Sequence, residues 1–270
     1  MLCPVPTKVF FLADRLRRLA ALLILPALLL ASPATLAAPG APLLVLRTAQ
    51  QSASLLKYAP DQPDRPGLCR ELMQAVERVD PGIRFTGLGL QGPLQRIERL
   101  LERGEIDVFF CLLKSPEREQ QWSYLTVPLY RIRYVAVQRL GDPIELRSME
   151  DLAAAGRRKP VLVTRGTLLA RMLKEAGVPM AEAPSEREAL KMLLLERTDV
   201  VFGQDMNLAN NMRAAGQGDR LRIAATVFRE DVQYVVTAKH VPTEVQARLT
   251  RALEQLERSG QIKAIAERYR

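Results

Sequence analysis

Arg118 stands in the stretch of the chain whose residue types best suit the binding of a small anion. Before it, residues 106–113 form an almost unbroken apolar run, which predicts a strand buried on both faces of a parallel sheet. Ser115-Pro116-Glu117 then has the residue order of a helix start. Ligands of open α/β sheets bind beyond the carboxyl ends of strands, so Arg118 is expected to receive a carboxylate or a phosphate. The alternative is an Arg–Glu pair on a solvated turn.

Other residues that could bind a ligand or take part in catalysis stand in patterns that are less specific. The only histidine, His240, has no HExxH motif or ligand partner around it, so neither a metal site nor a catalytic triad is predicted. Gly87–Gly92 matches G-x-G-x-x-G, but a dinucleotide site needs an acid at the end of the next strand, and Asp107 heads that strand instead. A glycine-rich turn is the favoured interpretation. The sequence therefore assigns no catalytic residue, no metal and no cofactor.

The N-terminus has the three parts of a secretory signal. Basic residues between 8 and 18 precede an apolar run over 19–31, and small residues follow over 32–37. The apolar run is too short to cross a bilayer. We expect removal of residues 1–37 by cleavage near Ala37 and export to the periplasm. A buried N-terminal helix is the alternative, and the basic flank argues against it.

The charge pattern excludes one class of partner. The formal net charge is +9, and the basic residues are interleaved with acids, as in Arg96-Ile97-Glu98-Arg99. This pattern is typical of solvated helix faces rather than of a nucleic-acid-binding stripe. Nucleic acid is therefore not expected as a partner, whereas a mild positive field favours small anionic ligands.

Two cysteines, Cys69 and Cys111, remain once the leader is removed. An even number of cysteines in an oxidising compartment is compatible with a disulfide. Cys69 falls in the first turn of a predicted helix and Cys111 near the end of the predicted strand, so both are expected at the same edge of one sheet. Two separate buried thiols remain the alternative.

Strands and helices alternate twice along the chain, first over residues 43–113 and again over 161–202. In the second run, Gly166-Thr167 is expected to open one helix, and Ser185-Glu186-Arg187-Glu188 has the residue order of a capping box that begins the next. This order favours parallel sheets with right-handed crossovers. Residues 100–109 are similar to 194–202, because each segment is a helix end followed by an apolar strand headed by aspartate. Two α/β units, and hence two lobes, are inferred.

Several segments follow one another in a recognisable order. They are the helix after Gly67, then "RGEIDVFFCLLKSPER" with the following "QWSYLTVPLY", then "VLVTRGTLLARML", and finally "SGQIKAIAERY". Their order resembles that of the extracellular solute-binding proteins of amino-acid ABC importers, which have the type II periplasmic binding protein fold. The resemblance implies an α/β protein of two lobes, each a mainly parallel sheet flanked by helices, joined by a hinge with two chain crossings. Lobe 1 would comprise residues 38–133 and 232–270, and lobe 2 residues 134–231.

The resemblance also implies a site between the lobes. Arg118 would hold a ligand carboxylate with the help of Ser115, and Gly166 with Thr167 would donate hydrogen bonds from lobe 2. Tyr58 would cover the apolar part of the ligand. The two crossings would lie near Arg131–Tyr134 and Arg229–Val232.

The sequence departs from the family pattern at the positions that recognise an amino group. Cys111 and Leu113 stand where the family often has hydroxyl or small residues. The carboxylate that binds the amino group would fall at Gln204, while Asp205 lies one residue later. An amino acid and a plain carboxylate therefore fit equally well.

Three functions are compatible with these patterns. The favoured one is a periplasmic solute-binding protein, a monomer and not an enzyme, that captures a small anionic or zwitterionic ligand and presents its closed form to an inner-membrane ABC permease. The second is an enzyme on the same fold, of the cyclic-acid dehydratase type. It would need a general acid of raised pKa in the cleft, and the sequence identifies none. The third is a sensor or interaction module with a degenerate cleft.

Overall fold

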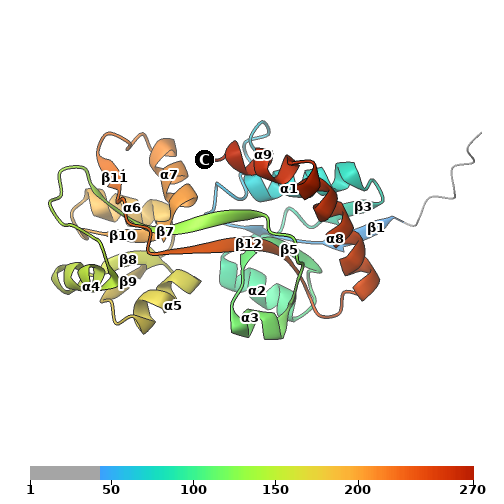
Figure 1. Ribbon diagram of the computed structural model, residues 1–270, viewed down its shortest axis with the longest axis horizontal. Coiled ribbons are helices and arrows are strands. Elements are labelled where there is room, and N and C mark those ends of the chain that lie inside the picture. Colours follow the sequence, from blue (N-terminus) through green and yellow to red (C-terminus); the bar gives the residue numbers. More distant parts are fainter. Residues whose placement is uncertain (1–42) are drawn as a thin grey trace, which may run out of the picture. The chain divides into compact units, whose positions relative to one another are not determined.

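The structure is a computed structural model that describes residues 43–270 of the chain (Figure 1). The predicted secretory signal, residues 1–37, lies outside the described residues. Among the described residues, no helix combines the length and apolarity needed to cross a membrane.

The first half of the described chain alternates strands and helices as predicted. Its elements are β1 (Leu44–Arg47), β2 (Gln50–Gln51), α1 (Leu68–Val79), β3 (Ile83–Thr86), β4 (Gln91–Gly92), α2 (Leu94–Glu102), β5 (Val108–Leu113), α3 (Pro116–Gln121), β6 (Ser123–Tyr124) and β7 (Tyr130–Arg139).

The second half repeats the alternation and ends in two helices. Its elements are α4 (Met149–Arg158), β8 (Val161–Thr164), α5 (Leu168–Glu175), β9 (Met180–Ala183), α6 (Glu186–Leu194), β10 (Val201–Gln204), α7 (Asp205–Ala214), β11 (Leu221–Ile223), β12 (Arg229–Thr237), α8 (Thr243–Arg258) and α9 (Gln261–Glu267).

The largest sheet has the strand order β5-β12-β7-β10-β8-β9. Strands β10, β8 and β9 are parallel, whereas β12 is antiparallel to both β5 and β7. The ladder partner of β5 is therefore β12, and this corrects the expectation of a parallel partner. The physical reason lies at the start of β5, where the carboxylate of Asp107 accepts from the backbone N–H of Arg47 at 2.7 Å. The Asp107 side chain thus takes the place of a backbone acceptor toward β1. One backbone bond joins the two strands here, from the N–H of Asp107 to the carbonyl of Arg47 at 2.8 Å.

Strands β7 and β12 run side by side through the middle of the described chain (Figure 1). Helices α1, α2, α3 and α8 gather toward one end of this strand pair, and α4 to α7 toward the other. The register pairs Arg229 with Tyr134 and Gln233 with Tyr130. The two segments for which chain crossings were predicted therefore lie opposite each other in one ladder. The lobe bounds themselves remain a prediction.

Side-chain caps begin the helices that lie nearest the strand ends. The side-chain oxygens of Ser115, Thr167 and Ser185 accept backbone N–H groups at the starts of α3, α5 and α6. The helix starts predicted at these three residues are confirmed. All six residues of β5 are buried, in agreement with the apolar run.

Candidate ligand-binding site

A cavity of about 60 Å³ lies where the carboxyl ends of β5, β8 and β10 approach one another. On one side its wall comes from the loop after β2, from β5 and from β12. On the other side it comes from β8, α5, α6 and β10. The residues that line it include Lys57, Cys111, Arg118, Glu186, Gln204 and Gln233. The wall thus draws residues from both predicted lobes.

Five polar side chains of the cavity wall have buried atoms without a hydrogen-bond partner among the described residues. These atoms belong to Gln51, Ser54, Thr164, Asn207 and Gln233. Gln233 is fully buried, and neither its amide oxygen nor its amide nitrogen is bonded. A buried polar group without a partner costs about 1–3 kcal/mol, so groups of this kind are normally satisfied by protein, water or ligand. The wall is therefore suited to a polar guest.

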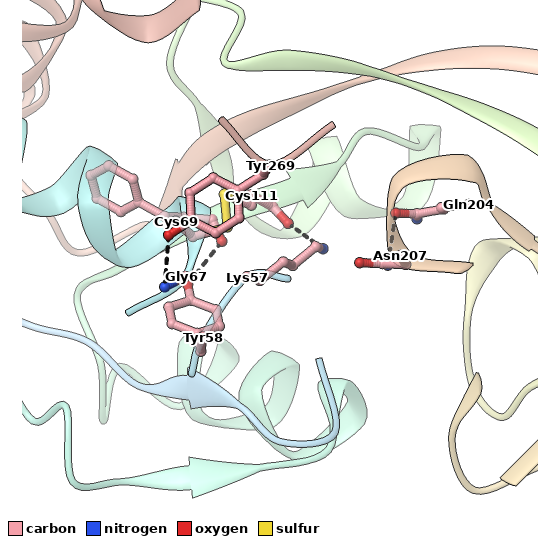
Figure 2. Close-up of a disulfide and its surroundings, with 9 residues drawn as sticks. Lys57, Tyr58, Gly67, Cys69, Cys111, Gln204, Asn207 and Tyr269 are labelled. Atoms are coloured by element: carbon pink, nitrogen blue, oxygen red, sulfur yellow. Dashed lines mark hydrogen bonds between the residues drawn. A yellow bond between two sulfur atoms is a disulfide. The ribbon is translucent and has the colours of Figure 1, made fainter. Parts of the chain in front are cut away.

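Lys57 supplies the cavity with a cation. The residue is buried, and its ammonium donates to the carbonyl of Cys111 at 2.9 Å (Figure 2). An ammonium has three donors, so this bond leaves the others free. Burial lowers the pKa of Lys57 to about 7; the nearby Arg118 adds to the lowering, and Glu186 opposes it. The ammonium of Lys57 is thus held in a buried environment that disfavours its charged form.

The start of α1 fixes the backbone of Lys57. The N–H groups of Leu68 and Cys69 donate to the carbonyls of Leu56 and Lys57. Gly67, which precedes the helix, has φ of 103°, and a Cβ there would lie 2.3 Å from the Lys57 carbonyl oxygen. Only glycine allows this approach. The predicted helix start at Gly67 therefore positions a residue that the sequence analysis did not select.

Cys111 presents its backbone, and not its side chain, to the cavity. It has φ of 65°, and the register of β5 with β12 shifts around it, which is the pattern of a β-bulge. Its side chain forms a disulfide with Cys69 in α1 (Figure 2). Of the two alternatives that the sequence left open, the structure contains the bonded one.

Glu186, the first residue of α6, supplies the cavity with an anion. The residue is only half-buried, but its carboxylate is the buried part and accepts from Asn211 Nδ2 at 3.2 Å and from the backbone N–H of Gln204. Gly203 leaves the room for it, because a Cβ there would lie 3.0 Å from one carboxylate oxygen. Burial raises the pKa of Glu186 to about 7.

Arg118 lines the cavity, but its charge is already balanced. One guanidinium nitrogen donates to the carbonyl of Leu113 at 3.0 Å, and another forms an ion pair with Glu98 of α2. Only 9% of the Arg118 side chain is exposed. The structure thus combines the two interpretations that the sequence allowed: Arg118 is at the site, and it is paired with a glutamate in a buried rather than a solvated position.

Two predicted contacts from lobe 1 lie elsewhere. Ser115 caps α3 and donates to Glu117 at 2.7 Å, and it does not line the cavity. The hydroxyl of Tyr58 donates to the carbonyl of Phe110 at 3.1 Å, and its ring stacks on Phe109 in the core. In the structure the first loop turns Lys57 toward the cavity and Tyr58 away from it.

The predicted contacts from lobe 2 are divided in the same way. Thr167 lines the cavity, with its hydroxyl bonded to the carbonyl of Thr164 at 2.8 Å, whereas Gly166 lies outside the wall, against Gln95. Gln204 lines the cavity, and Asp205 instead binds the backbone and guanidinium of Arg133 at 3.0 Å.

Sequence reasoning missed the two charged residues that face the cavity. Lys57 stands beside the selected Tyr58, in a loop between two predicted elements. Glu186 is part of a predicted helix start, where an acid is also expected for purely local reasons. Neither pattern distinguishes a ligand contact from an ordinary surface charge.

The strand order, the paired β7 and β12 strands and the cavity at the strand ends define the class. The chain has the fold of the two-lobe type II periplasmic binding proteins, and this confirms the predicted fold class and the predicted resemblance at the level of the fold. No family model matches the sequence, and no curated protein does.

Three solved structures illustrate the range of similar proteins. A histidine kinase sensor domain with similarity to periplasmic binding proteins is 20% identical with a TM-score of 0.72, over 83% of this chain and 95% of that chain. The GluR0 ligand-binding core from Nostoc punctiforme, in complex with L-glutamate, is 21% identical with a TM-score of 0.67, over 84% and 99%. An ancestral amino-acid-binding protein, a precursor of cyclohexadienyl dehydratase, is 18% identical with a TM-score of 0.68, over 83% and 95%. At these identities the likeness concerns the fold.

Proposed function

We propose that this chain is a periplasmic solute-binding protein that captures a small carboxylate-bearing ligand between its two lobes. The observation that carries the proposal is that five polar side chains of the cavity wall have buried atoms without a hydrogen-bond partner among the described residues. Apolar residues in place of these five side chains would make the folded state more stable, so stability alone does not explain the polar wall. A ligand with several donors and acceptors would satisfy them when the lobes close.

The known neighbours of the fold support a binding role. They include amino-acid-binding proteins, a substrate-binding protein of an amino-acid ABC transporter and sensor domains. The predicted secretory signal supports export of the chain to the periplasm. An inner-membrane ABC permease is the proposed partner, and a membrane-bound sensor is the alternative use of the same closed form.

Thermal unfolding in the presence of mixed amino acids and organic acids tests the proposal. A ligand at 100 times its Kd should stabilise the folded protein by about 2.7 kcal/mol. The variant Gln233→Leu should lose this stabilisation, because it removes two unpartnered atoms from the wall. Gln138→Leu is the matched control: Gln138 is also fully buried in a strand but lies outside the cavity wall. No stabilisation by any member of either mixture would contradict the proposed function.

One observation favours a second candidate. The sequence identified no acid of raised pKa for an enzyme of the cyclic-acid dehydratase type, but the carboxylate of Glu186 in the cavity is such a group. Incubation of the protein with hydroxylated cyclic acids, followed by NMR, would show a new alkene signal if the chain were such an enzyme. The signal should disappear in Glu186→Gln.

A further inference from the structure

A primary amine and a carboxyl group face the cavity from different parts of the chain. The amine of Lys57 comes from the loop that precedes α1, and the carboxyl of Glu186 comes from the start of α6. Figure 2 shows Lys57 reaching toward the turn that carries Gln204 and Asn207, two residues of the same cavity wall. Elements that are far apart in the sequence therefore bring a nucleophile and an acid to one cavity.

These two groups do not form an ion pair with each other. Each has a neutral partner instead: Lys57 donates to the carbonyl of Cys111, and Glu186 accepts from the amide of Asn211. Two buried charges are stabilised most by direct contact, which this pair lacks. The nitrogen of Lys57 and the carboxyl of Glu186 thus remain available to a molecule in the cavity.

The environment of both groups favours proton transfer at neutral pH. Burial lowers the pKa of Lys57 to about 7, whereas an ordinary lysine has a pKa of 10.5. About half of the Lys57 amines are therefore neutral at pH 7, against roughly one in three thousand for an ordinary lysine. A neutral amine is a nucleophile, and desolvation is one way in which proteins activate lysine. Burial also raises the pKa of Glu186 to about 7, so its carboxyl can both donate and accept a proton at this pH.

The rest of the wall suits a carboxylate on the guest. Three side chains have buried donor atoms without a partner among the described residues: the hydroxyls of Ser54 and Thr164 and the amide nitrogen of Gln233. Hydrogen bonds to an ionised acceptor are stronger than those between neutral groups. A guest held by these donors through its carboxylate would leave the buried amine free for a second functional group.

We propose that the chain binds a small 2-oxo acid covalently, as an imine of Lys57, with Glu186 as the residue that transfers the protons. This inference rests on the proposed function, because it names the ligand class and adds a chemical step at the same site. The lone pair of the Lys57 nitrogen attacks the carbonyl carbon and the C=O π bond opens. A proton then passes from nitrogen to oxygen, which gives a carbinolamine.

Glu186 completes the step as a general acid. Its carboxyl donates a proton to the new hydroxyl, which leaves as water while the C=N bond forms. The product is a protonated imine beside the Glu186 carboxylate, so two opposite charges are generated next to each other. The net reaction of amine with carbonyl gives imine and water and needs no oxidant or reductant. Addition of water reverses it and releases the acid unchanged, as a solute-binding role requires.

The volume of the cavity limits the guest. One water needs roughly 10–15 Å³ of such space, so a cavity of about 60 Å³ holds about four to six non-hydrogen atoms. Glyoxylate and pyruvate are of this size. A 2-oxo acid with a longer side chain would require the walls to move apart.

Reductive trapping of the chain without its predicted leader tests the proposal. The protein is incubated at pH 7 with pyruvate or glyoxylate, and portions are quenched with sodium borohydride at successive times. Reduction adds a hydride and a proton across the C=N bond, so peptide mass spectrometry should find the mass of one acid less one oxygen atom on Lys57. This modification should form at least tenfold faster than that of the exposed Lys191. Lactate, which has no carbonyl beside its carboxylate, should give no adduct.

Two variants test the two residues separately. Lys57→Arg keeps a cation but cannot form the imine, so the fast adduct should be absent. Glu186→Gln should slow formation of the adduct at least tenfold. Because Glu186 opposes the lowering of the Lys57 pKa, its removal leaves more of the amine neutral, and a slower reaction then reports lost proton transfer. The matched controls, Lys191→Arg and Glu188→Gln, change exposed residues of α6 and should leave the rate at Lys57 unchanged.

The outcomes distinguish this inference from the function on which it rests. If Lys57 is modified no faster than Lys191 while an acid of the mixtures stabilises the fold, the imine is wrong and the proposed function stands. An unchanged rate in Glu186→Gln would overturn the part given to Glu186. If no acid stabilises the protein and Lys57 shows no preferential modification, both proposals are wrong. Circular dichroism of each variant guards against loss of reaction through loss of folding.

Discussion

Two segments with similar sequences, α2–β5–α3 and α6–β10–α7, are anchored alike at their strand starts and differ at the carboxyl ends of their strands. At the strand starts they are alike: Asp107 binds Arg47 at 2.6 Å, and Asp199 binds Arg139 at 2.6 Å. At the carboxyl ends they differ, because β5 bulges at Cys111 and leads to the neutralised Arg118, whereas β10 runs straight into α7 beside Glu186. The strand starts, which are alike, anchor each strand. The carboxyl ends, which differ, hold the residues that face the cavity.

The largest expected effect concerns the disulfide, for which the second segment has no counterpart. The double variant Cys69→Ser/Cys111→Ser should lower the free energy of unfolding by about 4 kcal/mol, because the crosslink closes a loop between positions 42 residues apart. Urea unfolding of both proteins under non-reducing conditions measures the difference. Equal stabilities, or free thiols in the unmodified protein, would contradict the pairing and with it the asymmetry between the segments.

The next effect tests the likeness of the strand starts. Asp107→Ala and Asp199→Ala should each lower the free energy of unfolding by about 2–3 kcal/mol, since each removes a mostly buried carboxylate that accepts several hydrogen bonds. The basis of the estimate is the small exposed fraction of the two carboxylates, 12% and 7%. Losses that differ by more than about 1 kcal/mol would show that the two aspartates do not play the same part.

A smaller effect concerns the neutralisation of Arg118. A double-mutant cycle of Arg118→Met and Glu98→Gln should give a coupling on the order of 1–2 kcal/mol in the free energy of unfolding. The reason is that either single change leaves a charge without its partner, whereas the double change removes both charges. A coupling near zero would mean that Arg118 is available for a ligand anion, as in the first interpretation of the sequence.

The last expected effect is a pH dependence of the free energy of unfolding, caused by the two charges that face the cavity. Lys57 has its pKa lowered from 10.5 to about 7, so the unfolded chain binds more protons between these values and stability rises with pH there. Glu186 has its pKa raised from 4.5 to about 7, so the folded chain binds more protons in that range and stability falls as pH rises. Together, these two residues give the free energy of unfolding of the ligand-free protein a minimum near pH 7. On either side of the minimum it changes by at most about 1.4 kcal/mol per pH unit.

The pH dependence is measured by chemical unfolding from pH 5 to 10. The variant Lys57→Met/Glu186→Gln should flatten the minimum, whereas Lys191→Met/Glu188→Gln should leave it in place. A minimum that survives the first double variant would assign it to other groups.

The sequence was sufficient for most of the fold. The apolar run over 106–113, the caps at Ser115 and Ser185 and the repeated Asp-headed strands act locally, so they can be identified without knowledge of distant partners. The pairing of β5 with β12 could not be identified in this way, because it joins residues more than a hundred positions apart.

The candidate site was only partly predictable. Arg118, Thr167 and Gln204 do line the cavity, because the ends of strands and the starts of helices locate a site within a few residues. The direction of each side chain within such a turn depends on tertiary contacts. Tyr58 bonds to Phe110, and Asp205 bonds to Arg133. The cavity is instead faced by Lys57, which stands beside Tyr58, and by Glu186, which stands at a helix start.

The bulge at Cys111 bears on how selectivity can change in descendants of this chain. Its sulfur is bonded to Cys69 and its carbonyl accepts a hydrogen bond from Lys57, so a substitution at this position would remove the disulfide and destabilise the fold as well as change ligand binding. Retuning toward new solutes, by natural drift or by an engineer, is therefore expected to pass through positions 57 and 186 rather than through the strand end between them.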